Sequence, residues 1–94
     1  MRYSRLIFRV HAVQRMFERG ISETDVREVL EVGKVIKKNP KDLPYPSYLV
    51  LGFPSGRPIH VVASDDLSVK ATVVISVYQP DSKLWDKTFS RRKK

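Results

Sequence analysis

Cysteine is absent from this sequence, which excludes several kinds of structure and chemistry at once. A disulfide scaffold, a zinc site with thiolate ligands and a cysteine nucleophile all require that residue. Long apolar runs are also absent, because Leu6, Ile7 and Phe8 are followed directly by Arg9. So short a run suits neither a secretion signal nor a membrane span. We therefore expect a cytoplasmic protein that has no membrane contact.

Glycine is scarce and stands at predicted turns or at a strand end, so the chain has no glycine-rich loop for holding phosphate. Neither an HExxH motif nor an aspartate-rich loop is present, and two histidines without cysteine make a poor metal site. A serine triad would lack its nucleophile elbow. The sequence therefore predicts no metal and no cofactor.

The charge is strongly positive and is distributed unevenly. The net charge of the 94 residues is +8, carried by residues 1–20 and 83–94 around a nearly neutral centre. At this length we expect a single domain over residues 1–89, followed by a basic C-terminal tail at 90–94. Two basic segments suit a polyanion such as RNA, or an acidic protein partner. The alternative is that basic chain ends are merely solvated.

Two helices are predicted near the N-terminus. Apolar residues recur at helical spacing in the first of them: Val10, Val13, Met16, Phe17 and Ile21. Gly20 is a natural stop, so we expect this helix over residues 8–19. Ser22 is a good N-cap for the second helix, and the Asp25 carboxylate suits the positive end of its dipole. Gly33 is expected to end it.

Strand patterns follow the second helix, and turns that contain proline, glycine or aspartate separate them. The predicted strands cover residues 34–38, 48–53, 58–64 and 71–78. Lysines in the first of these are typical of an edge strand. The fold class is therefore predicted to be α+β, with two N-terminal helices packed on one face of a three- to four-stranded antiparallel sheet. The other face of the sheet is mixed in character and suits an exposed concave surface.

The predicted first helix carries a polar stripe. His11, Arg15 and Glu18 stand at i, i+4 and i+7, which places them on one face of the helix, with Arg19 beside them. This arrangement favours either a solvated helix surface or one side of a functional site.

The second histidine, His60, lies within a predicted strand and faces away from its chain neighbours. If strands 58–64 and 71–78 pair like face with like face, His60 lies beside Val74 and Ser76, with Tyr78 on the diagonal.

These side chains suit cleavage of RNA without a metal. Such a reaction needs a base for the 2′-hydroxyl proton and an acid for the leaving oxygen, and His11 and His60 can fill both roles near neutral pH. Arg15 can grip phosphate through its forked guanidinium, and Tyr78 can orient or stack on the substrate. Arg19, Arg91 and Arg92 are candidates for binding nucleic acid.

Structural interpretations of the same residues remain open. Each histidine can be a satisfied residue that only hydrogen-bonds a neighbouring loop or strand. Arg15 and Glu18 are spaced as an ordinary surface ion pair. Tyr78 and Trp85 suit packing, and residues 91–94 suit a disordered tail.

The sequence resembles a family of small bacterial and archaeal domains of unknown function, placed near the RelE/ParE superfamily and the BrnT-like toxins of type II toxin–antitoxin systems. The resemblance covers roughly residues 10–86. It rests on these segments: HAVQRMFERGIS, DVREVL, YPSYLVLGF, GRPIHVV, VISVYQPD and LWD.

The resemblance implies a RelE-like fold and a metal-free ribonuclease that acts on messenger RNA, often at the ribosome, together with a small antitoxin partner. The family's helix histidine and arginine fall on His11 and Arg15, its ERG signature on residues 18–20, its strand histidine on His60 and its final-strand tyrosine on Tyr78. Arg91 and Arg92 match the C-terminal basic residues of RelE-type toxins only loosely.

Two functional hypotheses follow. The first is a toxin-like, metal-independent endoribonuclease whose two histidines share one pocket. The second is a basic module that binds RNA, the ribosome or a protein partner and has no enzymatic activity.

Overall fold

The chain begins with a short strand rather than with a helix. In the computed structural model, which describes residues 5–43 and 45–93, β1 (Leu6–Phe8) precedes α1 (Val10–Arg19). The expected helix start at residue 8 is therefore wrong, because Phe8 is paired with Val74 in the sheet. Residues 1–4, Pro44 and Lys94 belong to the predicted domain and tail and lie outside the described part.

The link between the helices follows the prediction. Gly20 adopts a left-handed conformation (φ 64°) after α1, which a side chain would disfavour. The Ser22 hydroxyl accepts a hydrogen bond from the Asp25 amide, and the Asp25 carboxylate accepts one from the Ser22 amide, both at 3.0 Å. This capping box starts α2 (Glu23–Val32) and confirms the role predicted for Ser22.

The remaining strands form one sheet with β1: β2 (Lys34–Asn39), β3 (Ser47–Gly52), β4 (Ile59–Asp66) and β5 (Ala71–Tyr78). The strand order is β1-β5-β4-β3-β2. All pairs are antiparallel except β1 and β5, which run parallel. The α+β class is confirmed, but the sheet has five strands and is mixed. The expected count was too low because the Leu6–Phe8 run was assigned partly to the first helix.

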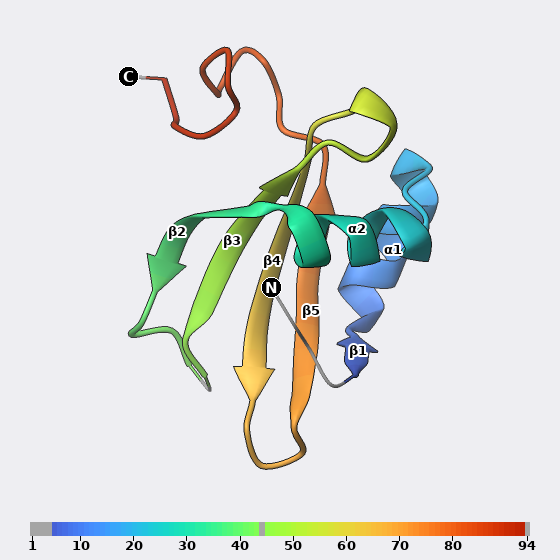
Figure 1. Ribbon diagram of the computed structural model, residues 1–94, viewed down its shortest axis with the longest axis vertical. Coiled ribbons are helices and arrows are strands. Elements are labelled where there is room, and N and C mark those ends of the chain that lie inside the picture. Colours follow the sequence, from blue (N-terminus) through green and yellow to red (C-terminus); the bar gives the residue numbers. More distant parts are fainter. Residues whose placement is uncertain (1–4, 44, 94) are drawn as a thin grey trace.

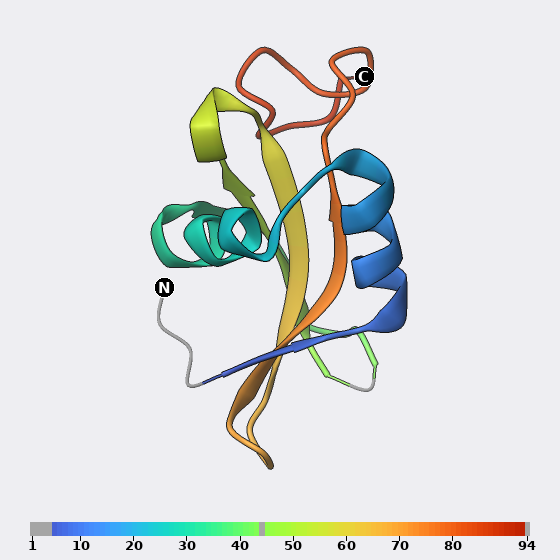
Figure 2. The same cartoon turned by 90° about the vertical axis from the view of Figure 1, so that its right-hand side faces the viewer.

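The two helices cover different parts of the sheet. Figures 1 and 2 show α2 across one face, where it contacts β3 and β4, and α1 alongside β5. The buried cluster between helices and sheet consists of apolar residues: Ala12, Met16, Ile21, Val26, Val29, Leu30, Val50, Ile59, Val61, Ala63, Val74 and Val77. Neither described helix is long and apolar enough to cross a membrane.

The first helix buries less than its sequence predicts. Only Ala12 and Met16 of α1 are buried, whereas Val10, Val13 and Phe17 are exposed. The reason is geometric: α1 packs mainly along one strand, β5, so a narrow stripe is enough to fill the contact. The helical spacing was predicted correctly, but the width of the buried face was not.

Candidate nucleic-acid interface

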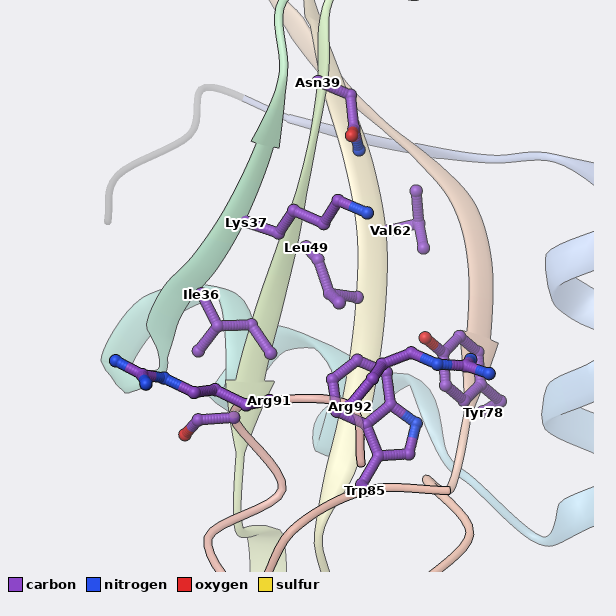
Figure 3. A pocket seen from close by; sticks show the side chains of 10 residues that line it. Ile36, Lys37, Asn39, Leu49, Val62, Tyr78, Trp85, Arg91 and Arg92 are labelled. Carbon is purple, nitrogen blue, oxygen red and sulfur yellow. The ribbon is translucent and has the colours of Figure 1, made fainter. Parts of the chain in front are cut away.

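A groove lies on the face of the sheet opposite the buried cluster (Figure 3). Its volume is about 470 Å³. Ten side chains from β2 to β5 and from the C-terminal segment (residues 79–93) line it: Ile36, Lys37, Asn39, Leu49, Val62, Tyr78, Trp85, Ser90, Arg91 and Arg92. The volume lies within the range of pockets that bind small organic groups.

Strand pairing brings the lining residues of the sheet together. Lys37 of β2 is paired with Leu49 of β3, and Leu49 is paired with Val62 of β4. Paired residues point to the same side of a sheet, whereas their chain neighbours point to the other side. Leu49 and Val62 therefore form an apolar floor. Figure 3 shows the Lys37 side chain extending from β2 across it.

The C-terminal segment forms a compact loop that turns back from β5 toward β3 and β2 (Figure 1). The Asp86 carboxylate accepts hydrogen bonds from the Thr88 amide, the Thr88 hydroxyl and the Ser90 amide. The backbone amide of Asp86 donates to the Arg91 carbonyl, and that of Lys93 donates to the Leu84 carbonyl. Residues 90–93, assigned from the sequence to a tail, are thus folded back on this loop.

His60 lies beneath the groove, and its ring has a partner on each nitrogen. Nε2 is 2.8 Å from the Phe89 carbonyl oxygen, and Nδ1 is 3.2 Å from the Tyr78 hydroxyl oxygen. A carbonyl can only accept, so Nε2 must carry the hydrogen and donate it. In the neutral ring Nδ1 is then an acceptor, and the Tyr78 hydroxyl donates to it. The Tyr78 oxygen keeps free lone pairs as acceptors for a ligand.

Two aromatic rings enclose the imidazole. The ring centroid of Trp85 is 4.4 Å from that of His60, and the ring of Tyr78 is 5.2 Å away, both edge to face. His60 has no exposed surface. Burial lowers the pKa of His60 below its ordinary value, and the hydrogen bond to Phe89 opposes this only in part. His60 is therefore a neutral residue at neutral pH.

The rim of the groove is cationic. Lys37, Arg91 and Arg92 are exposed, and none of the lining residues is acidic. The Arg92 guanidinium lies 5.7 Å from the Trp85 ring centroid, within the range of a cation–π contact. Burial raises the pKa of Tyr78, while the charge of Arg92 opposes this shift. The groove thus offers three cations, a hydroxyl and an apolar floor, a combination that suits an anion bearing a flat apolar group.

The structure brings together three of the residues that the sequence singled out. Tyr78, Arg91 and Arg92 all line the groove. His60 is hydrogen-bonded to Tyr78 but is not part of the lining. It is paired directly with Tyr78 and not placed beside Val74 and Ser76, so the expected register of β4 and β5 is wrong. The hairpin register is set by the turn and by an irregularity between Val62 and Ala63, which alternation along each strand does not reveal.

The predicted residues of α1 lie elsewhere. His11 and Arg15 are exposed on α1 and take no part in lining the groove. An ion pair with a nitrogen–oxygen distance of 3.9 Å joins Arg15 to Glu18, as their spacing allows. Arg19 borders a second, polar hollow of about 630 Å³ with Pro58, Gln79, Pro80, Asp81, Ser82 and Phe89. The groove therefore does not unite the two histidines, and their catalytic roles stay predictions.

Sequence reasoning missed Lys37, Asn39 and the position of Trp85. From the sequence, lysines in an edge strand are expected only to protect it against unwanted pairing. The face that Lys37 occupies depends on an irregularity between Val35 and Lys37, which strict alternation does not reveal. Trp85 is the sole tryptophan of the chain, and its size indicates packing. The sequence does not show that it packs against the His60 imidazole.

Metal ligands are not grouped in the described part of the chain, where no three His, Asp or Glu side chains come together. Comparison with known families matches residues 8–79 to a domain of unknown function, DUF4258. The chain belongs to this family. No curated protein and no solved structure shows significant similarity to it. The DUF4258 range includes Lys37, His60 and Tyr78, whereas most of the C-terminal segment, with Arg91 and Arg92, follows it.

Proposed function

We propose that this protein binds single-stranded RNA in the groove of the sheet. The observation that supports the proposal is the convergence of Lys37, Arg91 and Arg92 on one groove whose lining contains no carboxylate. Arginine and lysine side chains are the usual partners of phosphate, and contacts with phosphate supply most of the affinity for nucleic acid.

The floor of the groove favours a single strand over a duplex. Leu49, Val62 and the rim of Trp85 offer apolar contact to the face of an unpaired base, which a base-paired helix keeps stacked inside. The Tyr78 oxygen, which donates its own hydrogen to His60, is available to accept a hydrogen bond from a ribose hydroxyl or a base. A ribose 2′-hydroxyl would favour RNA over DNA.

A toxin-like endoribonuclease with a RelE-like fold is the second candidate. It is supported by the resemblance in sequence and by the Tyr78 hydroxyl beside Arg92 in the groove. In this interpretation the substrate is messenger RNA in the cytoplasm, free or on the ribosome, and the protein partner is a small antitoxin. Tyr78 and the two arginines, rather than a pair of histidines, are then the residues in contact with the reacting phosphate.

Binding is tested by fluorescence anisotropy with a labelled twelve-nucleotide oligouridylate. We expect Arg91→Ala combined with Arg92→Ala to weaken binding by about tenfold or more, because two phosphate contacts are lost. The matched control is Arg15→Ala combined with Arg19→Ala, which removes the same charge from α1 and should change the affinity by less than about threefold. Equal losses in the two double variants, or no binding by the unaltered protein, would contradict the proposal.

Cleavage is tested in the same samples with messenger RNA and EDTA. For the endoribonuclease, Tyr78→Phe should abolish cleavage while oligouridylate binding changes by less than about threefold, since the arginines remain. Intact RNA with unaltered protein, both free and on ribosomes, would rule out the enzyme and leave the RNA-binding module.

A further inference from the structure

In the part of the chain that the structure describes, one hydrogen bond attaches the C-terminal segment to the sheet. Among the hydrogen bonds of the described residues, those of residues 81–93 join one part of the segment to another, with one exception. The exception is the bond from His60 Nε2 to the Phe89 carbonyl. Trp85, which is 7% exposed, adds the apolar contact by covering the imidazole edge to face.

The same attachment fixes the cations of the groove. Arg91 and Arg92 follow Phe89 after one residue, Ser90. Arg92 forms an antiparallel β-bridge with Trp85, and its guanidinium lies over the Trp85 ring. Phe89 itself has a left-handed backbone (φ 59°), which is costly for a residue with a side chain and needs support from surrounding contacts. If Phe89 and Trp85 leave His60, the two arginines leave the groove with them.

We propose that His60 is a positioning residue that holds the C-terminal segment on the sheet, and that protonation of His60 releases the segment and disassembles the cationic side of the groove. The consequence for RNA rests on the proposed function, whereas the attachment itself does not.

Protonation changes the hydrogen bond at Nδ1 of the buried ring, while Nε2 still donates to the Phe89 carbonyl. Nδ1 gains a hydrogen, so the Tyr78 hydroxyl loses the acceptor to which it donates. The new charge has no exposed surface, and no carboxylate among the described residues is bonded to the ring. The groups that face it are the Tyr78 phenol on β5 and, across Trp85, the Arg92 cation. Burial of an unpaired charge beside a second cation is unfavourable.

The direction of the pH effect follows from burial. The pKa of His60 is lowered while the segment is attached, and it returns to its ordinary value near 6.5 when the segment is released. The released state therefore binds the proton more tightly. Attachment is at full strength above about pH 6.5 and weakens as the pH falls below that value.

Trp85 provides a direct readout, because it is the sole tryptophan and contacts the imidazole. Its fluorescence is followed from pH 8 to pH 5 in the full chain. We expect one transition with a midpoint below 6.5. His11→Gln should keep the transition, since the other histidine is exposed on α1. His60→Gln should lose it, because glutamine retains a donor for the Phe89 carbonyl but does not titrate in this range.

Hydrogen exchange in the unaltered protein keeps the proposal testable if His60→Gln does not fold. After correction for the intrinsic pH dependence of exchange, protection of the Asp86, Phe89 and Lys93 amides should fall between pH 7.5 and 5.5, while that of β4 and β5 is retained. Unchanged protection of these three amides, or a fluorescence transition that persists in His60→Gln, would overturn the proposal.

Oligouridylate affinity separates the two proposals. In His11→Gln, which removes the exposed histidine, we expect affinity to fall by about fivefold or more between pH 7.5 and 5.5; the fall should be absent when His60→Gln is added. A fluorescence transition without RNA binding at any pH would contradict the proposed function and leave the attachment standing. RNA binding without the fluorescence transition would contradict the proposed role of His60 and leave the proposed function standing.

Discussion

Lys37 and Lys38 are neighbours in β2, but only the Lys37 side chain lines the groove. Lys37 is paired with Leu49 and lines the groove, while Lys38 is paired with Tyr48 and borders a separate hollow with Pro40 and Pro46. Both lysines are exposed and carry the same charge. They are therefore a matched pair for testing which face of the sheet binds RNA.

At the residue scale we predict that Lys37→Ala weakens oligouridylate binding by about three- to tenfold, because one phosphate contact is lost. Lys38→Ala should change the affinity by less than about twofold. Anisotropy titrations of both variants at one salt concentration make the comparison. Equal effects would show that only the overall charge matters, and a larger effect for Lys38→Ala would place the RNA on the other face.

Single residues were predictable from the sequence where their chemistry is distinctive. Tyr78, Arg91 and Arg92, which the sequence singles out by their chemistry, all line the groove, although their roles stay predictions. Ser22 was predicted correctly as a helix cap. The environment of His60 was not predictable, since it depends on a shift in the register of β4 and β5 and on a loop that folds back from residue 79. Neither has a signal in local spacing.

At the scale of elements, the junction of α2 and β2 is unusually tight. A Cβ atom added to Gly33 would lie 2.3 Å from the Val29 carbonyl oxygen and 2.6 Å from that of Leu51. Both neighbours are backbone atoms of a helix and a strand, so they cannot move aside as a flexible side chain could. The close approach of α2 to β3 requires glycine at this position.

We therefore predict that Gly33→Ala lowers the free energy of unfolding by about 1–3 kcal/mol or more, through overpacking. Ser82→Ala, at an exposed residue of the C-terminal segment, should change it by less than about 0.5 kcal/mol. Urea denaturation followed by circular dichroism measures both. Full stability of Gly33→Ala would mean that α2 and β3 separate at no cost, contrary to the packing described above.

The elements themselves were largely accessible to sequence reasoning. Both helices and the strands β2 to β5 were predicted within a few residues, because periodicity and turn residues mark them. β1 was missed, since three apolar residues beside a helix carry no clear period and its parallel partner lies far along the chain. The exposure of Phe17 was also hidden, because spacing alone does not tell how wide a face the tertiary contact covers.

At the scale of the whole molecule, the two basic ends of the chain have different positions. Arg91 and Arg92 line the groove. His11 and Arg15 lie on α1, which packs against β5, on the β1 side of the sheet and away from the edge strand β2. The sequence-based hypothesis treated both ends as sides of one site. In the fold, the cations of the groove come from the C-terminal segment and from the edge strand β2.

This arrangement predicts a modest dependence of binding on salt. Three phosphate contacts correspond to a slope of about −2 in a plot of log affinity against log salt concentration for a single strand. Removal of Arg91 and Arg92 should bring the slope to about −0.7, which is the value for one contact. Anisotropy titrations over a range of salt concentrations measure both slopes. A slope that is unchanged in the double variant would place the phosphate contacts outside the groove.

The most direct test of RNA binding in the groove is an NMR titration of the ¹⁵N-labelled protein with a short oligouridylate. We predict shifts of the Trp85 indole N–H signal and of the backbone amide signals of Lys37, Leu49, Val62 and Arg92, whereas the amide signals of His11 and Arg15 should not move. Shifts confined to α1, with the groove signals unmoved, would contradict it.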